Sequence, residues 1–407
     1  MRDIQNMGYL ARQPILGPAG KTFGYELLYR AALGDPASTT GDDAAAARVL
    51  SETVLNIGLD TVTAGLPAFV KLTRPLLMND AATLLPPANT VLELSGDIAA
   101  DDDVVDACHR LRSLGYVLAL DDFVAGSNAE ALLPFAKFVK VDVVATPEAS
   151  WDRLARRLEP QGVRLIAEKA ETAETVSRAR AAGATLFQGY FFCKPTALGT
   201  SVALPARRVV YVHLIAALGR DDLTVAALED LVKHDVSLTY RVLRSVNSAA
   251  FGLRRDIDSL RQALVLLGLQ QIRKWAMVWA LAGINTSAPE TVVVALLRAR
   301  TCELIGDALS DSSDMGSGFF IAGLCSLLDA MLGQTMPEAL GDLPLPAPVR
   351  AALFGESNMH RLVLDLVIAY ERADWDRTAA LAHDAGVDVA AVPQAYARAL
   401  EWARVIS

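Results

Sequence analysis

Short apolar segments recur along the first half of the chain, and each carries a polar or charged side chain at or near its end. The clearest covers residues 116–123, where a continuous apolar run is followed by the adjacent carboxylates Asp121 and Asp122. An apolar run without alternation is typical of a strand that is buried on both faces. A solvated turn would explain this one segment, but its repetition indicates a site. The other polar end positions are Glu26, Lys71, Glu93, Lys140, Asp142, Glu168 and Gln188.

The spacing of these segments predicts how they are connected. Most gaps are long enough for a helix, as in residues 104–115 and 173–183, and alternating strand and helix favours a parallel sheet. Polar groups at strand ends favour an α/β barrel of the TIM type, whose functional residues lie at the carboxyl ends of the strands. The short Gly-Pro-Ala-Gly link at residues 17–20 suits a hairpin, which allows the first strand to pair antiparallel. We assign residues 1–198 to this barrel.

The pattern changes after about residue 206, where strand-like runs disappear and apolar positions follow helical spacing. The spacing predicts helices at residues 291–309, 318–332, 360–370 and 392–405, and others between residues 237 and 283. A further helix is expected at residues 42–58, within the first half. Residues 196–205 have no clear period and are expected to be the linker. We therefore assign residues 199–407 to an all-α helical domain.

Composition and charge narrow the class of protein. A chain of 407 residues with 52% hydrophobic and 21% charged residues is expected to form two packed domains. The net charge of −9 gives no general attraction to nucleic acid, so a nucleic-acid partner is not expected. Four widely spaced cysteines without a C-x-x-C pair suggest reduced thiols. No secretory signal is visible, and the most apolar stretch, residues 275–284, is too short to span a bilayer, so we expect a cytoplasmic protein without a membrane partner.

An ordered set of motifs surrounds the polar strand ends. It comprises Gln13-Pro14-Ile15, Glu26-Leu27-Leu28-Tyr29-Arg30, Leu92-Glu93, Leu120-Asp121-Asp122-Phe123, Lys140-Val141-Asp142, Ala167-Glu168 with Glu171, and Gln188-Gly189-Tyr190. This set resembles the EAL family of cyclic di-GMP phosphodiesterases. Residues 237–252 and 262–268 are similar to the core of the HDOD family of helical signalling domains. The two in this order resemble the EAL–HDOD regulatory proteins of bacteria.

The resemblance implies a metal-dependent site for a cyclic dinucleotide. Phosphodiester hydrolysis needs divalent metals, and oxygen ligands suit Mg²⁺ or Mn²⁺. Glu168 matches the catalytic base, and Lys140 matches the residue that helps to place the attacking water. The residues that match metal ligands are Glu26, Glu93, Asp121 and Asp122. Those that match contacts to cyclic di-GMP are Gln13, Glu26, Leu28, Arg30, Asp142, Glu171 and Gln188.

The sequence departs from the family pattern at several places. Lys71 stands where the family has a metal-ligating Asn, and an ammonium has no acceptor atom. At about 4 Å, an ammonium would repel a divalent ion by roughly 8 kcal/mol at an effective dielectric constant of about 20. Gly96 replaces a Glu that braces the loop after the Asp pair, and that loop, residues 124–128, differs as well. Lys169-Ala170 replaces the usual Gly-Val.

Two interpretations of these departures stay open. In the first, which the sequence favours, the EAL domain has lost turnover and acts as a receptor or an interaction platform, and the HDOD domain passes on its state through a protein partner. In the second, the chain is an active phosphodiesterase with an unusual metal shell. Cyclic di-GMP is a candidate ligand in both, and a homodimer is compatible with both. Only an active enzyme would require Mg²⁺ or Mn²⁺.

The five histidines do not predict a second metal centre. His234-Asp235 and His383-Asp384 look like the His-Asp pairs of metal phosphohydrolases, but the sequence shows no metal-ligand spacing around them. Cys108-His109 falls within an expected helix, where packing explains it better than ligation. We therefore expect no catalytic metal in the helical domain.

Overall fold

The computed structural model describes residues 8–17, 20–30, 58–79, 81–190, 224, 226–228, 268, 289–309, 316–341 and 345–406. The expected helix at residues 42–58, the linker at 196–205 and the expected helices between residues 237 and 283 lie almost wholly outside this part of the chain. The chain divides into two units. One contains Met1–Lys194 together with Leu366–Ala397, and the other contains Pro195–Asp365 and Arg398–Ser407.

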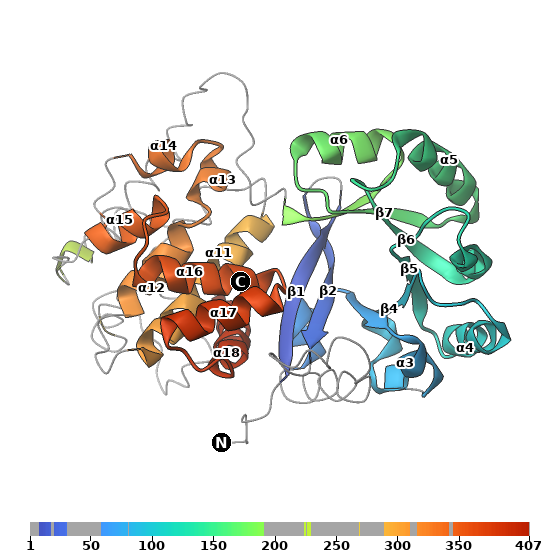
Figure 1. Cartoon of the computed structure of the whole chain (residues 1–407), viewed down its shortest axis with the longest axis horizontal. Coiled ribbons are helices and arrows are strands. Elements are labelled where there is room, and N and C mark those ends of the chain that lie inside the picture. Colours follow the sequence, from blue (N-terminus) through green and yellow to red (C-terminus); the bar gives the residue numbers. More distant parts are fainter. Residues whose placement is uncertain are drawn as a thin grey trace. The chain divides into compact units, whose positions relative to one another are not determined.

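The first unit contains a closed barrel of strands β1 to β8 in sequence order (Figure 1). Strand β1 pairs antiparallel with both β2 and β8, and every other neighbouring pair is parallel. The predicted TIM-like barrel with an antiparallel first strand is therefore confirmed. The strands are β1 Tyr9–Leu16, β2 Thr22–Arg30, β3 Ala68–Leu72, β4 Thr90–Ser95, β5 Val117–Asp121, β6 Ala136–Asp142, β7 Arg164–Glu168 and β8 Leu186–Gln188.

Helices fill the connections between the strands. The best defined by its sequence is α4, Asp102–Ser113, which begins where the Asp101 carboxylate accepts a hydrogen bond from the Val104 N–H at 3.1 Å. Acidic residues in its first turn and basic residues in its last complement the helix dipole. The other helices are α2 Leu59–Thr63, α3 Arg74–Met78, α5 Glu148–Leu158 and α6 Ala173–Ala181, with 3₁₀ turns at Ala81–Leu84, Pro87–Asn89, Asn128–Phe135 and Glu159–Gln161.

The barrel interior is closed by a layer of apolar side chains. Phe69 and Phe138 meet edge to face, with ring centroids 5.3 Å apart, and Phe23 packs on both rings. The Arg164 guanidinium lies 4.7 Å from the centroid of the Phe23 ring. This layer forms a water-excluding floor beneath whatever lies at the carboxyl ends of the strands. Its members are Ile15, Phe69, Val91, Ala119, Phe138, Ile166 and Leu186.

A C-terminal segment, Leu366–Ala397, belongs to the barrel unit, a grouping that the sequence did not predict. It contains the end of α16 (Met359–Glu371), all of α17 (Trp375–Ala385) and the start of α18 (Ala391–Ile406). Tyr370 is fully buried, and its hydroxyl accepts from the Leu10 N–H at 3.2 Å and donates to the Leu10 carbonyl at 2.8 Å. It therefore satisfies both backbone groups of one residue of β1.

The second unit is helical in the part that the structure describes, as predicted. Its helices are α11 Pro289–Ala308, α12 Gly316–Cys325, α13 Leu328–Leu332, α14 Met336–Leu340 and α15 Ala347–Leu353. The expected single helix at residues 318–332 is two helices, α12 and α13. Helices α11 and α12 pack closely because Gly323 has no side chain: a Cβ there would lie 2.6 Å from the Ala299 Cα. No helix among the described residues is long and apolar enough to cross a membrane.

Replacing Tyr370 by Phe tests the attachment of the C-terminal segment to β1. The substitution keeps the buried ring but leaves the N–H and carbonyl of Leu10 without their partner. Because unsatisfied buried polar groups are costly, we expect the free energy of unfolding to fall by about 1–3 kcal/mol. Urea unfolding followed by circular dichroism measures this change. A loss below about 0.5 kcal/mol, the range of neutral surface substitutions, would contradict it.

Candidate functional site

The polar site grows out of the apolar floor by the two-residue period of the strands. Side chains two positions apart on a strand share a face. Each floor residue on β3 to β8 is therefore followed, two positions later, by an inward-facing polar residue, and on antiparallel β1 Gln13 takes the same level two positions before Ile15. The residues reached in this way are Lys71, Glu93, Asp121, Lys140, Glu168 and Gln188. Glu26 of β2 joins them opposite Gln13.

Lys140 lies at the centre of this layer and is fully buried. Its Nζ is 2.9 Å from Glu26 Oε2, 3.1 Å from Glu93 Oε1, 3.1 Å from Asp121 Oδ1 and 3.0 Å from Glu168 Oε1. An ammonium has three N–H donors, so it cannot donate to all of these carboxylates at once. Neither oxygen of Glu93 accepts a hydrogen bond from the described residues.

Burial, together with an excess of negative over positive charge, shifts the pKa of the members of this cluster. Burial raises the pKa of Glu93 well above its usual value, against the effect of Lys140. Burial also raises the pKa of Glu168, to about 7, although Lys140 again opposes the shift. Burial alone would lower the pKa of Lys140, but the surrounding carboxylates, Glu26 first, raise it well above normal. The site therefore favours protons on some carboxylates or an additional cation.

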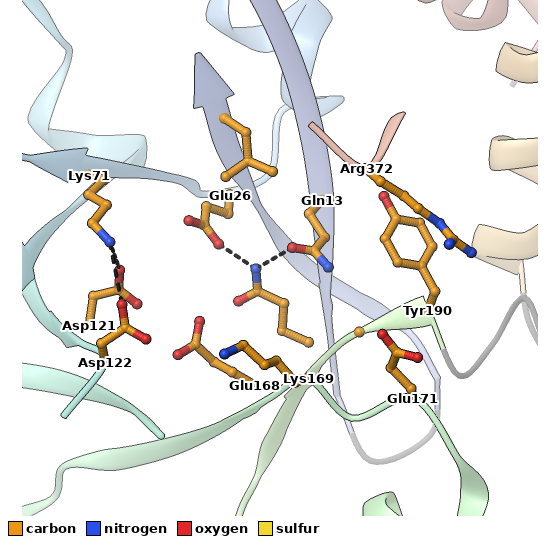
Figure 2. A pocket seen from close by; sticks show the side chains of 13 residues that line it. Gln13, Glu26, Lys71, Asp121, Asp122, Glu168, Lys169, Glu171, Tyr190 and Arg372 are labelled. Carbon is orange, nitrogen blue, oxygen red and sulfur yellow. Dashed lines mark hydrogen bonds and ion pairs between the residues drawn. The ribbon is translucent and has the colours of Figure 1, made fainter. Parts of the chain in front are cut away.

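Lys71 brings a second ammonium to the cluster from the end of β3. Its Nζ lies 2.7 Å from Asp121 Oδ2 and 3.6 Å from Asp122 Oδ2. Dashed lines mark these ion pairs in Figure 2. Burial alone would lower the pKa of Lys71, but Asp121 and Asp122 raise it above its usual value. The Lys71 carbonyl is held by a hydrogen bond from the Tyr29 hydroxyl at 2.6 Å. The strand end is therefore anchored, and the side chain reaches the Asp pair.

The backbone around the Asp pair depends on Gly96. A Cβ at Gly96 would lie 2.6 Å from the Asp122 carbonyl oxygen and 2.8 Å from that of Asp121. Asp122 itself has a left-handed backbone conformation, with φ of 48°, which is uncommon for a residue other than glycine. The Phe123 N–H then donates to the Lys140 carbonyl at 3.0 Å. Gly96 thus leaves room for the loop where a larger side chain would displace it.

A pocket of about 360 Å³ opens above the cluster. Glu93 and Lys140 lie beneath it, fully buried. Among the residues that line the pocket, the Gln188 amide donates to Gln13 Oε1 at 2.8 Å and also to Glu26. The lining residues are Gln13, Glu26, Leu28, Lys71, Asp121, Asp122, Glu168, Lys169, Glu171, Gln188, Gly189, Tyr190 and Arg372.

Two of the expected ligand-contacting residues do not line the pocket. Arg30 Nη1 lies 3.2 Å from Asp376 Oδ1, on the C-terminal segment. Asp142 Oδ2 lies 2.6 Å from Lys169 Nζ, and its other oxygen accepts from the N–H groups of Val144 and Ala145. Arg372 lines the pocket although no sequence motif contains it. It directly follows the end of α16, far along the chain from the barrel strands.

The carboxylates fit a divalent cation. Oxygens of Glu26, Glu93 and Asp121 lie within 4.8 Å of one another, and the same holds for Asp121, Asp122 and Glu168. Oxygen ligands of this type suit Mg²⁺ or Mn²⁺. The buried oxygens of Glu93 accept no hydrogen bond from the part of the chain that the structure describes, which suits them to a cation held by the first group. An ammonium already contacts members of each group: Lys140 Nζ lies within 3.1 Å of Glu26, Glu93 and Asp121. Lys71 contacts Asp121 and Asp122 of the second group.

Two known domain families match most of this chain. The EAL domain model matches residues 5–195, and the HDOD domain model matches residues 204–339. The cyclic di-GMP phosphodiesterase CdgJ of Vibrio cholerae is 32% identical and covers 100% of this chain and 94% of its own. The uncharacterized protein YuxH of Bacillus subtilis is 30% identical, over 97% of each chain. A solved calcium and cyclic di-GMP complex of Klebsiella pneumoniae BlrP1 is 25% identical, with a TM-score of 0.39, over 47% of this chain and 56% of that chain.

Replacing Lys140 by Met tests its role at the centre of the cluster. The substitution leaves several buried carboxylates without their shared cation, and breaking a buried ion pair in this way costs about 3–5 kcal/mol. We expect a loss of that size in the free energy of unfolding in EDTA, measured by urea titration.

Lys137→Met on the same strand is the matched control, because Lys137 is exposed and its Nζ donates to the Gly162 carbonyl at 3.1 Å, its one hydrogen bond to the described residues. Equal losses of stability in the two variants would show that the buried ammonium of Lys140 stabilises the fold no more than the exposed ammonium of Lys137 does.

Proposed function

Because this chain belongs to the EAL family and joins its EAL domain to an HDOD domain, we propose that it is a cyclic di-GMP signal-transduction protein whose barrel binds the nucleotide without turnover. The barrel, residues 1–198, acts as a receptor or interaction platform. The helical domain, residues 199–407, passes on its state to a protein partner in the cytoplasm. A homodimer is compatible with this role.

The position of Lys71 is the observation that carries this proposal. Its ammonium contacts both carboxylates of the Asp pair, at 2.7 and 3.6 Å, where a second divalent ion would need them as ligands. An ammonium neutralises charge but has no acceptor and cannot activate water. Lys71 therefore stands in for a metal ion in charge alone. Gly96 supports the loss of turnover. A Cβ at this position would meet the carbonyl groups of Asp121 and Asp122, so a bracing Glu has no room there.

An active phosphodiesterase is the second candidate function, favoured by the gathering of Glu26, Glu93, Asp121 and Glu168 around Lys140. The relative CdgJ is named as such an enzyme. In this case Glu26, Glu93 and Asp121 would hold Mg²⁺ or Mn²⁺. The metal would supply charge neutralisation for a phosphodiester and activation of water. Glu168, whose pKa is raised to about 7, would take up a proton near neutral pH.

Calorimetry and a hydrolysis assay, run in parallel, distinguish the two functions. We expect the full chain to bind cyclic di-GMP in Mg²⁺ and to release no linear dinucleotide above background. Steady release of linear dinucleotide that is abolished in Glu168→Ala would establish the enzyme instead. Absence of cyclic di-GMP binding in Mg²⁺ and in Mn²⁺ would overturn the receptor and the enzyme functions and leave the barrel as an interaction platform only.

Replacing Lys71 by Asn tests whether its ammonium occupies the place of a cation. The substitution removes the positive charge and adds a carbonyl oxygen, so we expect tighter Mg²⁺ binding and a melting temperature that rises with Mg²⁺ through linkage. The wild-type melting temperature should be nearly indifferent to EDTA. Lys137→Asn, which changes an exposed lysine of β6 in the same way, should leave the Mg²⁺ response unchanged. An identical Mg²⁺ response in Lys71→Asn and the wild type would show that Lys71 does not occupy a metal position.

A further inference from the structure

Three cationic side chains of the described residues line the pocket, and two of them already contact a carboxylate. Lys71 contacts Asp121 at 2.7 Å, and Lys169 contacts Asp142 at 2.6 Å. The third, Arg372, is exposed, and among the described residues no carboxylate lies within ion-pair distance of its guanidinium. An anion that enters the pocket faces the carboxylate cluster around Lys140, which holds more negative than positive charge. Arg372 is therefore the cation best placed to receive it.

Arg372 is held at the pocket wall through both of its neighbours in the chain. Before it, the Glu371 carbonyl accepts a hydrogen bond from the Tyr190 hydroxyl at 2.6 Å. After it, Ala373 takes a left-handed conformation with φ of 54°, and its N–H donates to the Tyr370 carbonyl at 2.9 Å. Asp374 then caps α17 by accepting from the Arg377 N–H at 3.2 Å. Arg372 lies in a short, well-defined turn between α16 and α17.

The direction of the Arg372 side chain is set by an aromatic ring. Its guanidinium carbon lies 5.2 Å from the centroid of the Tyr190 ring, at the wall opposite Lys71 (Figure 2). A guanidinium that stacks on a ring keeps its planar set of N–H donors available at its edge. Such an edge matches the two oxygens of a phosphate group. This geometry prepares Arg372 for an anionic ligand before the ligand arrives.

We propose that Arg372 is a ligand-contacting residue that binds a phosphate of the cyclic dinucleotide, so that the C-terminal segment Leu366–Ala397 forms part of the nucleotide site. The proposal rests on the function proposed above. The segment already makes one ion pair with the barrel, since Asp376 Oδ1 lies 3.2 Å from Arg30 Nη1, outside the pocket lining. In the proposed complex, Arg372 adds a second charged contact, with the nucleotide. Ligand binding then stabilises the docked segment, and docking of the segment strengthens ligand binding.

Calorimetric titration of the full chain with cyclic di-GMP in Mg²⁺, repeated with the linear dinucleotide, tests the proposal. We expect Arg372→Ala to weaken binding by about tenfold or more, the effect of losing a charge-assisted hydrogen bond. The slope of log affinity against log salt should also become shallower. Arg377→Ala, an exposed arginine of the same segment that does not line the pocket, is the matched control and should bind as the wild type does. Arg372→Gln should repeat the loss if the Ala variant folds poorly.

The outcomes separate the two proposals. If Arg372→Ala and Arg372→Gln both bind cyclic di-GMP with wild-type affinity, Arg372 does not contact the nucleotide, and the receptor function still stands. An equal loss in Arg372→Ala and Arg377→Ala would also overturn it, because the effect would then be one of net charge. Failure of the wild type to bind either nucleotide would overturn the receptor function and this inference with it.

Discussion

The site depends on one electrostatic constraint: carboxylates from four strands converge on the buried ammonium of Lys140. Transfer of charge out of water is costly, and a buried ion is tolerated only when it is paired. Lys140 meets that condition, but the carboxylates outnumber it. Burial raises the pKa of Glu93 and Glu168, and the neighbouring carboxylates add to this rise. Every other feature of the pocket bears on how the remaining negative charge is balanced.

The two most telling departures from the EAL pattern act on the same dipeptide. Lys71 contacts the side chains of Asp121 and Asp122, and Gly96 faces their carbonyl groups. Lys71 lies on β3, and Gly96 directly follows the adjacent strand β4. The ammonium of Lys71 neutralises part of the charge of the Asp pair, and the absence of a side chain at residue 96 leaves room for the carbonyl groups of the same pair. The two substitutions form one compatible arrangement, which is why they carry more weight together than either does alone.

The sequence predicts the barrel well because each of its signals is local. Apolar strand runs, intervening helices such as α4 and the hairpin link into β2 each follow from nearby residues, and the pairing of β1 with β2 and β8 is as expected. The convergence on Lys140 also has a sequence signal, since each floor residue on β3 to β8 precedes a polar one by two positions. Arg372 has none. Its place depends on how the C-terminal segment packs on β1, through contacts such as that between Tyr370 and Leu10, 360 positions apart.

The C-terminal segment gives a physical route by which the pocket could influence the rest of the chain. The division between the two units falls inside α16, between Asp365 and Leu366. A helix is a continuous hydrogen-bonded element, so a restraint on its last turn is felt by its preceding turns. A ligand can shift such an element only as far as its affinity differs between the docked and undocked states. The proposed contact between Arg372 and the nucleotide would create that difference. Signal transfer through this contact would require no turnover of the nucleotide.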